Sequence, residues 1–426
     1  MTADPTTETA TESPAAPGAV GPDAAAGAPP LVGFDSVDVV FGDRVKPALD
    51  LADQGLGREE ILAQTGCTVA VRNASLDIAE GELCVLMGLS GSGKSSLLRC
   101  VNGLNPITRG RVVVRCAGEE IDVGAAGARQ LKRLRSDWVS MVFQQFALMP
   151  WRTVRDNVGL GLEFRGVPKA ERRHMVEAQL EMVRLVEWAD KYPAELSGGM
   201  QQRVGLARAF ATGSDILLMD EPFSALDPLI RSHLQDELLE LQRRLKKTIL
   251  FVSHDLDEAL KIGNRIVIME GGRIVQVGRP EQIVTRPASE YVANFVANVN
   301  PLNVLRGRTL MVTLDTLPAV ENGRRLEDGS LVRLDERGRP ARVVEPDGQE
   351  RGPINYGRPE AAGPGDWASA PAEIPMREVI ELRHRTQRPV LMTDPSGRLV
   401  GVVGEGEIVN ALLNQSRAEN GVNAQK

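Results

Sequence analysis

The sequence has no long hydrophobic run. Among its 426 residues the longest apolar stretches, such as 249–252, have the length of a strand, whereas a membrane-spanning helix needs about 20 apolar residues. The N-terminus carries acids but no base, and it lacks the basic and apolar regions of a secretory signal peptide. We therefore expect a cytoplasmic protein that lies at a membrane only where a partner holds it.

Cysteine, histidine and net positive charge are also scarce. The four cysteines contain no CxxC pair, and only four histidines could complete a metal site. We therefore expect reduced thiols rather than disulfides or a Cys/His metal centre. The formal net charge is −7, whereas a general nucleic-acid-binding protein has a basic surface. No nucleic-acid partner is expected.

The chain length predicts two or three domains, at about 150 residues each. Residues 1–30 are mostly Ala, Pro, Thr and Gly, a composition that cannot bury enough apolar surface to offset ordering, so this segment is predicted to be disordered. Residues 31–300 alternate apolar strands with helical stretches, which indicates an α/β domain with a largely parallel sheet. Within it, residues 43–68 read as an insertion of two short helices and about 150–213 as an inserted helical subdomain.

The pattern changes after residue 300. Gly, Pro and Arg are dense through 306–370, so residues 301–374 are predicted to be a linker or an irregular region. Residues 375–413 then read as helix, strand, strand and helix around a turn at 394–397. They are expected to form a small α+β domain, or part of one, followed by a tail at 414–426.

The strongest motif is GLSGSGKS at residues 88–95, which follows an apolar strand and precedes a helical run. It matches the phosphate-loop pattern GxxxxGK[ST], and the strand and helix around it argue against an ordinary glycine-rich turn. The glycines let backbone N–H groups surround phosphate oxygens, and the helix N-terminus favours an anion. Lys94 can reach the β- and γ-phosphates, and Ser95 can ligate Mg²⁺. The predicted phosphate-binding residues are Gly88, Ser90, Gly91, Gly93, Lys94, Ser95 and Ser96.

Two further motifs follow. LSGGMQQR at 196–203 precedes an apolar helix, so the Ser197 hydroxyl and the amides of Gly198 and Gly199 offer donors to an anion at a helix start. Ser197 could instead, or also, cap that helix. The apolar strand at 216–219 ends in Asp220 and Glu221. Such acids lie where α/β sheets bind ligands, although strand-end acids also occur by chance.

In this order and spacing the motifs resemble those of the ABC ATPases, with Met200 where the signature LSGGQ has Gln. The resemblance implies an ABC-type P-loop NTPase fold that binds ATP and Mg²⁺. It further implies that Asp220 holds Mg²⁺, through water, and that Glu221 is the general base for the attacking water.

The resemblance also assigns four residues that would otherwise read as structural. Gln144, in MVFQQ, corresponds to the glutamine that contacts Mg²⁺ and water and senses the membrane partner. His254 corresponds to the histidine that contacts the γ-phosphate, and Asp227 to an aspartate that acts across a dimer. Phe41 is placed to stack on adenine, and a core position in its strand is an equally good interpretation.

The family works as two copies that sandwich two ATP molecules and drive a separate membrane permease, which an extracytoplasmic substrate-binding protein supplies. The implied location is the cytoplasmic face of the plasma membrane. DNA-repair ATPases of this type need a long coiled coil between phosphate loop and signature, for which residues 95–196 leave no room. Translation factors of this type carry two cassettes in one chain.

One subgroup is especially similar. Residues 88–93, 146–150, 224–231 and 253–259, together with the insertion 43–68, resemble the ATPases of importers for quaternary amines such as glycine betaine, proline betaine or choline. An importer of another small solute, such as an amino acid, is the alternative, because no residue of such an ATPase contacts the substrate. In that subgroup a pair of CBS modules senses ionic strength. Here only 375–413 resembles one module, in degenerate form, so we expect dimer contacts and weak osmotic gating.

Overall fold

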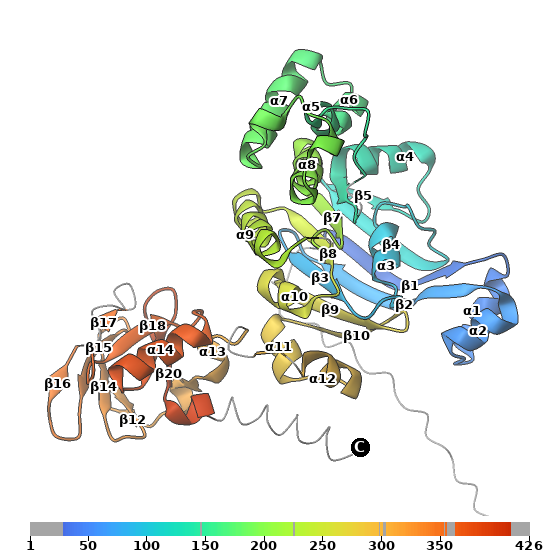
Figure 1. The fold of residues 1–426 in the computed structure, drawn as a ribbon. Helices are drawn as coiled ribbons and strands as arrows, with labels where there is room; N and C mark the ends of the chain where they lie inside the picture. Colours follow the sequence, from blue (N-terminus) through green and yellow to red (C-terminus); the bar gives the residue numbers. More distant parts are fainter. Residues whose placement is uncertain are drawn as a thin grey trace, which may run out of the picture.

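The computed structural model describes residues 29–144, 147–224, 226–297, 299–300, 304–352, 354–355 and 363–409. The predicted disordered segment, up to residue 28, and the tail 414–426 lie outside these residues. An N-terminal domain (29–300) is followed by a smaller C-terminal domain (304–409), drawn in orange and red beside helices α11 and α12 in Figure 1. None of the helices in the described ranges is long and apolar enough to cross a membrane.

A six-stranded sheet in the order β10-β9-β3-β8-β7-β6 forms the centre of the N-terminal domain. All neighbours are parallel except β10, which runs antiparallel to β9 at one edge. Every residue of β3, β7 and β8 is buried, and this is why each contains an uninterrupted apolar run rather than an alternating pattern. The predicted largely parallel sheet is confirmed. Its strands are β3 (Leu83–Met87), β6 (Val139–Val142), β7 (Ile216–Asp220), β8 (Thr248–Val252), β9 (Arg265–Glu270) and β10 (Arg273–Gly278).

A second, antiparallel sheet in the order β2-β1-β4-β5 packs against the first. Helix α3 (Lys94–Cys100) contributes Leu97 and Leu98 to the core that both sheets share. The first half of β4 is exposed and rich in arginine, whereas its second half is mostly buried, so its sequence shows no regular alternation. The strands are β1 (Val32–Phe41), β2 (Thr68–Ile78), β4 (Arg109–Cys116) and β5 (Glu119–Asp122).

The stretch 43–68, for which the sequence predicts two short helices, holds α1 (Val45–Asp53) and α2 (Arg58–Thr65). The chain leaves β1 at Phe41 and returns to β2 at Thr68, and these two residues are paired across the sheet. The insertion therefore projects from one end of this sheet, at the blue edge of Figure 1. Its small core consists of Val40, Ala48, Ala52, Ile61, Cys67 and Val69.

Helices gather at the opposite end of the domain, above α9 in Figure 1. Helices α5 to α8 share an apolar core of their own, as the predicted helical subdomain at about 150–213 requires. The remaining helices of the domain cover the sheets or lead toward the C-terminal domain. The helices are α4 (Ala128–Arg133), α5 (Val154–Val158), α6 (Leu160–Phe164), α7 (Lys169–Met182), α8 (Gly198–Ala211), α9 (Pro228–Leu245), α10 (Leu256–Ile262), α11 (Pro280–Thr285) and α12 (Glu290–Val296).

The prediction of a linker or irregular region at 301–374 is wrong for most of the described residues there. An antiparallel sheet in the order β12-β13-β14-β15-β16 occupies 319–351, and β11 and β18 belong to a second sheet. These strands are only two to five residues long, so the glycines of the turns between them dominate the sequence pattern. The strands are β11 (Val312–Thr313), β12 (Ala319–Val320), β13 (Gly323–Arg325), β14 (Leu331–Leu334), β15 (Pro340–Val344), β16 (Glu350–Arg351), β17 (Ile354–Asn355) and β18 (Ala368–Pro371).

The elements predicted within 375–413 are present as far as the structure describes them. They are α14 (Met376–Thr386), β19 (Val390–Thr393), β20 (Leu399–Val403) and a helical stretch at 405–409. β18 pairs in parallel with β19, so this sheet already begins inside the stretch predicted to be a linker. The resemblance to a CBS module stays a prediction.

A short helix, α13 (Gly307–Leu310), lies at the junction of the two domains. Glu281 of α11 forms ion pairs with Arg306 and Arg308, whose guanidinium nitrogens lie 3.4 and 3.3 Å from its Oε1. Arg308 also pairs with Glu373 at 2.8 Å. Charged contacts thus join the C-terminal domain to α11.

Candidate functional site

The loop 88–93 connects the buried end of β3 to the first turn of α3. Gly88 and Gly93 have φ values of 141° and 99°. A Cβ atom at Gly88 would lie 2.1 Å from the carbonyl oxygen of Met269, and one at Gly93 would lie 2.3 Å from that of Ala70. Only glycine fits both positions, so the backbone curls as the phosphate-loop motif requires. Ser90 and Gly91 are exposed at the apex of the loop, and Ser96 lies in the first turn of α3.

Lys94 points back into this curl. Its Nζ donates to the carbonyl oxygens of Gly88 and Leu89, at 2.8 and 2.9 Å. Burial lowers the pKa of Lys94, and the nearby carboxylates of Glu221 and Asp220 oppose that shift. An ammonium group held among carbonyl oxygens in a curled loop is positioned to exchange those partners for an anion.

Ser95 and Asp220 meet below the loop. The Ser95 hydroxyl donates to Oδ1 of Asp220 at 2.6 Å, across two elements that are 125 residues apart in sequence. The guanidinium of Arg99 pairs with Oδ2 of the same carboxylate at 2.8 Å. Because the Asp220 side chain is almost fully buried, this charge partner offsets the cost of removing the carboxylate from water.

Glu221 brings His254 and Gln144 together. Its Oε2 lies 3.1 Å from Nδ1 of His254 and 3.4 Å from Nε2 of Gln144. Glu221 has a φ of 46°, in the left-handed region that non-glycine residues rarely adopt. The chain therefore turns sharply after Asp220, and the two consecutive acids serve two separate clusters.

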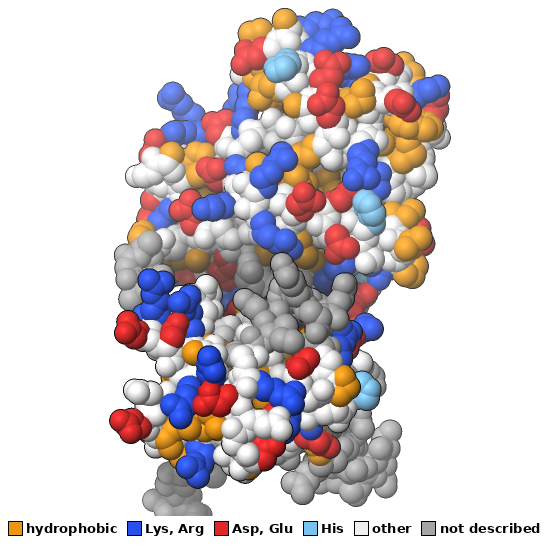
Figure 2. Space-filling view, turned by 90° about the vertical axis from the view of Figure 1, so that its left-hand side faces the viewer, with side chains coloured by type: hydrophobic (Ala, Val, Ile, Leu, Met, Phe, Trp, Pro, Cys, Tyr) orange, Lys and Arg blue, Asp and Glu red, His pale blue; other side chains and the backbone are white. Residues whose placement is uncertain are grey.

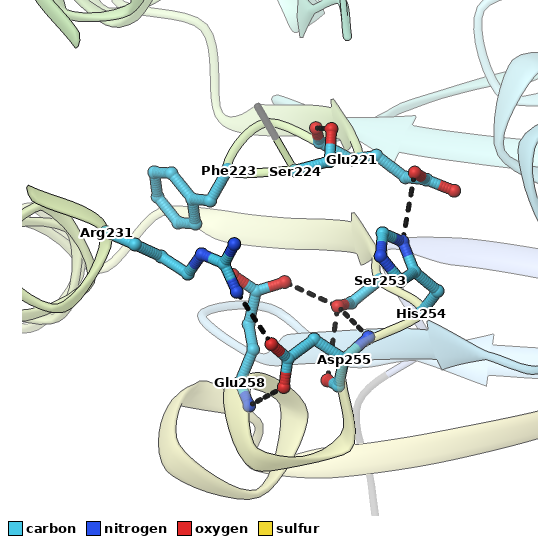
Figure 3. A pocket seen from close by; sticks show the side chains of 8 residues that line it. All are labelled: Glu221, Phe223, Ser224, Arg231, Ser253, His254, Asp255 and Glu258. Carbon is cyan, nitrogen blue, oxygen red and sulfur yellow. Dashed lines mark hydrogen bonds and ion pairs between the residues drawn. The ribbon is translucent and has the colours of Figure 1, made fainter. Parts of the chain in front are cut away.

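The turn that carries His254 is fixed from below by a polar network (Figure 3). The Ser253 hydroxyl donates to Glu258 and accepts from the Asp255 N–H at 2.9 Å. Asp255 also pairs with Arg231 of α9 at 2.8 Å. Burial raises the pKa of Glu258, against the effect of its hydrogen bonds. The network links the histidine turn to α9, the helix that Asp227 caps.

Ser197 and Asp227 lie in a second group. Each caps a helix: Ser197 accepts from Met200 N at 3.4 Å at the start of α8, and Asp227 accepts from Ile230 N at 3.0 Å at the start of α9. The two helix starts touch, since a Cβ atom at Gly199 would lie 3.1 Å from the Ile230 side chain. The capping role considered for Ser197 is therefore present. Gly198 beside it is exposed, as are Ser197 and Asp227 themselves.

Phe41 ends β1 with 38% of its surface exposed. The alternative of a core position is therefore wrong, and the ring is accessible to a ligand. Phe41 pairs with Thr68, and the next residues of β2 include Ala70, whose carbonyl oxygen lies under Gly93. The ring thus stands at the end of the strand pair that supports the phosphate loop.

Two arginines at the site were not identified from the sequence. Arg99 follows Ser95 by four residues, a spacing that places both on one helix face, so its contact with Asp220 had a detectable signal. Arg58 of the insertion donates to the Gly91 carbonyl oxygen at 2.7 Å. No sequence pattern indicates that second contact, because it depends on how α2 folds back onto the sheet.

Comparison with known proteins supports the same interpretation. A family model described as ABC transporter matches residues 71–224. The chain is 40% identical to the glycine betaine/carnitine transport ATP-binding protein GbuA of Listeria monocytogenes over 88% of this chain and 95% of that protein. It is 48% identical to the glycine betaine/proline betaine transport system ATP-binding protein ProV of Escherichia coli, over 64% of this chain and 67% of that protein.

Among solved structures, cbiO1 from Clostridium perfringens, part of the ABC transporter complex cbiONQ, superimposes with a TM-score of 0.50. It is 23% identical and covers 64% of this chain and 97% of its own. At that identity the match concerns the fold alone, and it agrees with the arrangement of sheets and helices in the N-terminal domain.

Proposed function

Because the chain belongs to the family of ABC transporter ATP-binding proteins, we propose that it hydrolyses ATP to power import of a quaternary amine. One observation carries the assignment of the reaction centre. The four neighbouring parallel strands β3, β8, β7 and β6 deliver the phosphate loop, His254, the acids 220–221 and Gln144 to one edge of the sheet. This is the edge at which α/β sheets bind ligands.

The residues divide the chemistry among them. Lys94 and the backbone amides of 88–96 neutralise and orient the phosphates, with Phe41 stacking on adenine. Glu221 accepts the proton of the attacking water, while His254 and Gln144, both within reach of its Oε2, hold the water and the γ-phosphate in place. Positioning and charge stabilisation of this kind account for most of the catalysis in phosphoryl transfer.

The oxygen atoms of Ser95 and Asp220 fit Mg²⁺, which prefers a few hard oxygen ligands together with phosphate and water. Ser95 Oγ and Asp220 Oδ1 lie 2.6 Å apart, so both can face one ion, with Gln144 as the further candidate ligand. When bound, the ion would neutralise charge on the β- and γ-phosphates. Arg99 would then have to release or share the carboxylate of Asp220.

Ser197, Gly198, Gly199 and Asp227 are proposed to act on the ATP of a second copy of the chain. They lie at the starts of α8 and α9, where Ser197, Gly198 and Asp227 are exposed, and this exposure supports a site shared between copies. Mixed dimers of Lys94→Ala and Ser197→Arg chains should retain ATPase activity in the one intact site, unlike either pure variant. If the mixed dimers and both pure variants all lack ATPase activity, the result would count against a site shared between copies.

A permease is the proposed membrane partner, at the cytoplasmic face of the plasma membrane, with a substrate-binding protein acting through it. Residues 147–151 follow Gln144 and end in Trp151, which is 73% exposed. We propose that this exposed aromatic belongs to the surface that binds the permease; Phe146 of the predicted loop lies outside the described residues. A cysteine at position 149 should cross-link to a cytoplasmic loop of the permease. Cross-linking only through residues 375–409 would contradict this.

The assignment of the substrate depends on the relatives, whose names specify glycine betaine together with carnitine or proline betaine. An importer of another small solute, such as an amino acid, remains the alternative. The test is uptake of labelled glycine betaine by a strain that lacks this chain and is complemented with wild-type or Glu221→Gln protein. Competition by proline betaine or choline should reduce uptake and an amino acid should not. Uptake restored by the Glu221→Gln protein would overturn the proposal.

For the C-terminal domain we propose a degenerate CBS-like module that supports dimer contacts. The order β18, α14, β19, β20 and a final helical stretch is that of one compact β-α-β-β-α unit. The antiparallel sheet at 319–351 has no helix among its described elements, so it does not supply a second unit of the same kind.

A further inference from the structure

The insertion α1–α2 contacts the phosphate loop through one side chain. The guanidinium of Arg58 donates from Nη1 to the Gly91 carbonyl oxygen at 2.7 Å and from Nε to the Val69 carbonyl oxygen at 2.6 Å. One planar group thus joins the apex of the loop to β2, and partial burial lowers the pKa of Arg58 without removing its charge. Charged donors of this kind form the stronger hydrogen bonds in proteins.

The carbonyl groups of the loop are held from several sides. Lys94 binds those of Gly88 and Leu89 from inside the curl. The N–H of Gly272, in the turn after β9, donates to the Ser92 carbonyl oxygen at 3.1 Å. Arg58 supplies the anchor at Gly91, on the exposed side of the loop.

This anchor controls the direction of an amide. In a planar peptide the C=O and N–H point opposite ways, so holding the Gly91 carbonyl outward turns the Ser92 N–H inward. There it donates to the Leu89 oxygen at 3.1 Å, the same oxygen that Lys94 Nζ binds at 2.9 Å. Two donors therefore converge on one point inside the curl, which is where a phosphate oxygen would replace the carbonyl.

Gly91 would not hold that orientation by itself. It has a φ of 77°, and a Cβ atom there would meet nothing within 4 Å, so neither its own side chain nor close packing restrains the peptide. The insertion, by contrast, is fixed to the sheets. Asp53 of α1 makes two 2.8 Å hydrogen bonds to Arg109 of β4, and Arg72 of β2 donates to the Leu56 carbonyl oxygen at 3.2 Å.

We propose that Arg58 is a positioning residue of the nucleotide site, through which the insertion holds the peptide 91–92 in its phosphate-binding orientation. The inference rests on the proposed ATP site. Arg58 acts on the loop rather than on the γ-phosphate, so ATP and ADP should depend on it equally. Its effect should appear in nucleotide affinity and not in turnover at saturating ATP.

The experiment compares Arg58→Gln and Arg58→Lys with Arg44→Gln in the full-length chain. Arg44 precedes α1 in the same insertion and donates to the Gln64 carbonyl oxygen at 3.3 Å, so its loss tests the insertion without touching the loop. Calorimetric titration with ADP and a non-hydrolysable ATP analogue gives the affinities. Steady-state kinetics give KM and kcat, and thermal melting reports folding.

Arg58→Gln should weaken both nucleotides about three- to tenfold, the size expected for losing a charged hydrogen bond, with kcat nearly unchanged. Arg58→Lys, which can reach only one of the two carbonyl groups, should lie between it and wild type. Arg44→Gln should bind as wild type. Unchanged affinity in Arg58→Gln, an equal loss in Arg44→Gln, or a loss confined to the ATP analogue would each overturn the proposal. Failure of the wild-type chain to bind nucleotide would instead refute the proposed function.

Discussion

The two domains use β-structure in opposite ways. In the N-terminal domain β3, β7 and β8 are buried throughout, and their ends carry polar residues that converge on one edge. In the C-terminal domain the central strands of the sheet at 319–351 consist mainly of half-buried and exposed residues, and charged side chains of both signs are mixed over the face of the domain drawn in Figure 2. In a buried parallel sheet the carboxyl ends of the strands meet at one edge and can form a binding site there, whereas short antiparallel strands do not bring their carboxyl ends together.

The substitution Glu221→Gln tests most directly whether function is concentrated at the edge of the N-terminal sheet. The amide cannot accept a proton from water, so ATP turnover should fall by about 10²- to 10⁴-fold, the usual contribution of a general base. ATP binding should persist, and an ATP-dependent dimer should accumulate. Turnover of radiolabelled ATP and size-exclusion chromatography measure the two effects. Glu240→Gln, at an exposed glutamate of α9, is the matched control and should keep wild-type turnover. Near wild-type turnover in the Glu221→Gln chain would show that another group is the base.

Trp367→Ala tests the independence of the C-terminal domain. Trp367 is fully buried and donates to Glu345 at 3.1 Å, while Arg388 lies over its ring and pairs with the same glutamate at 2.6 Å. The truncation should destabilise this domain by about 3–5 kcal/mol and leave ATPase activity intact. Denaturant unfolding, read against activity, separates the two. Trp367→Phe should cost less, and parallel loss of ATPase would mean that the domains unfold as one unit.

Glu258 is expected to make protein stability depend on pH, by a smaller amount than the loss expected for Trp367→Ala. Burial raises the pKa of its carboxyl above the unfolded value. The folded state therefore binds the proton more tightly, so this group stabilises the fold most at low pH, and its contribution is lost as pH rises through the folded pKa. Glu258→Gln should gain stability relative to wild type as pH rises from acid to neutral. Melting temperatures across that range test this; a gain confined to acid pH would contradict it.

The smallest response is expected from salt. The Debye length falls from about 10 Å at 0.1 M to about 3 Å at 1 M, but on the face of the C-terminal domain drawn in Figure 2 the described acidic and basic side chains are mixed, so screening acts on charges of both signs. Transport by the reconstituted complex should therefore change little with internal salt, both for the intact chain and for one ending at residue 303. Steep activation that disappears on truncation would show that this domain senses ionic strength.

Sequence alone predicted the N-terminal domain well, because its information is local. The apolar run at 216–219 predicts β7, which is present, and the two acids after it predict a ligand-binding strand end. The loop 88–95 is recognisable from its glycine spacing. The contact of Arg99 with Asp220, 121 residues away, follows from the spacing of Arg99 and Ser95 on one helix face. The contact of Arg58 with Gly91 was not predictable, because it exists only where α2 folds onto β2. In the C-terminal domain β13 has three residues, too few to show an alternating pattern, so the sequence of that region predicts a linker where the structure has a sheet.

The left-handed backbone of Glu221 implies a trade-off between activity and stability. Holding a non-glycine residue in such a conformation costs about 1–3 kcal/mol, which the surrounding fold must supply. Asparagine tolerates this conformation better than glutamate, yet it cannot act as the base. A Glu221→Asn chain should thus be inactive and melt at a higher temperature than the native protein. At position 221 the residue that gives the most stable protein would then differ from the residue that gives an active one.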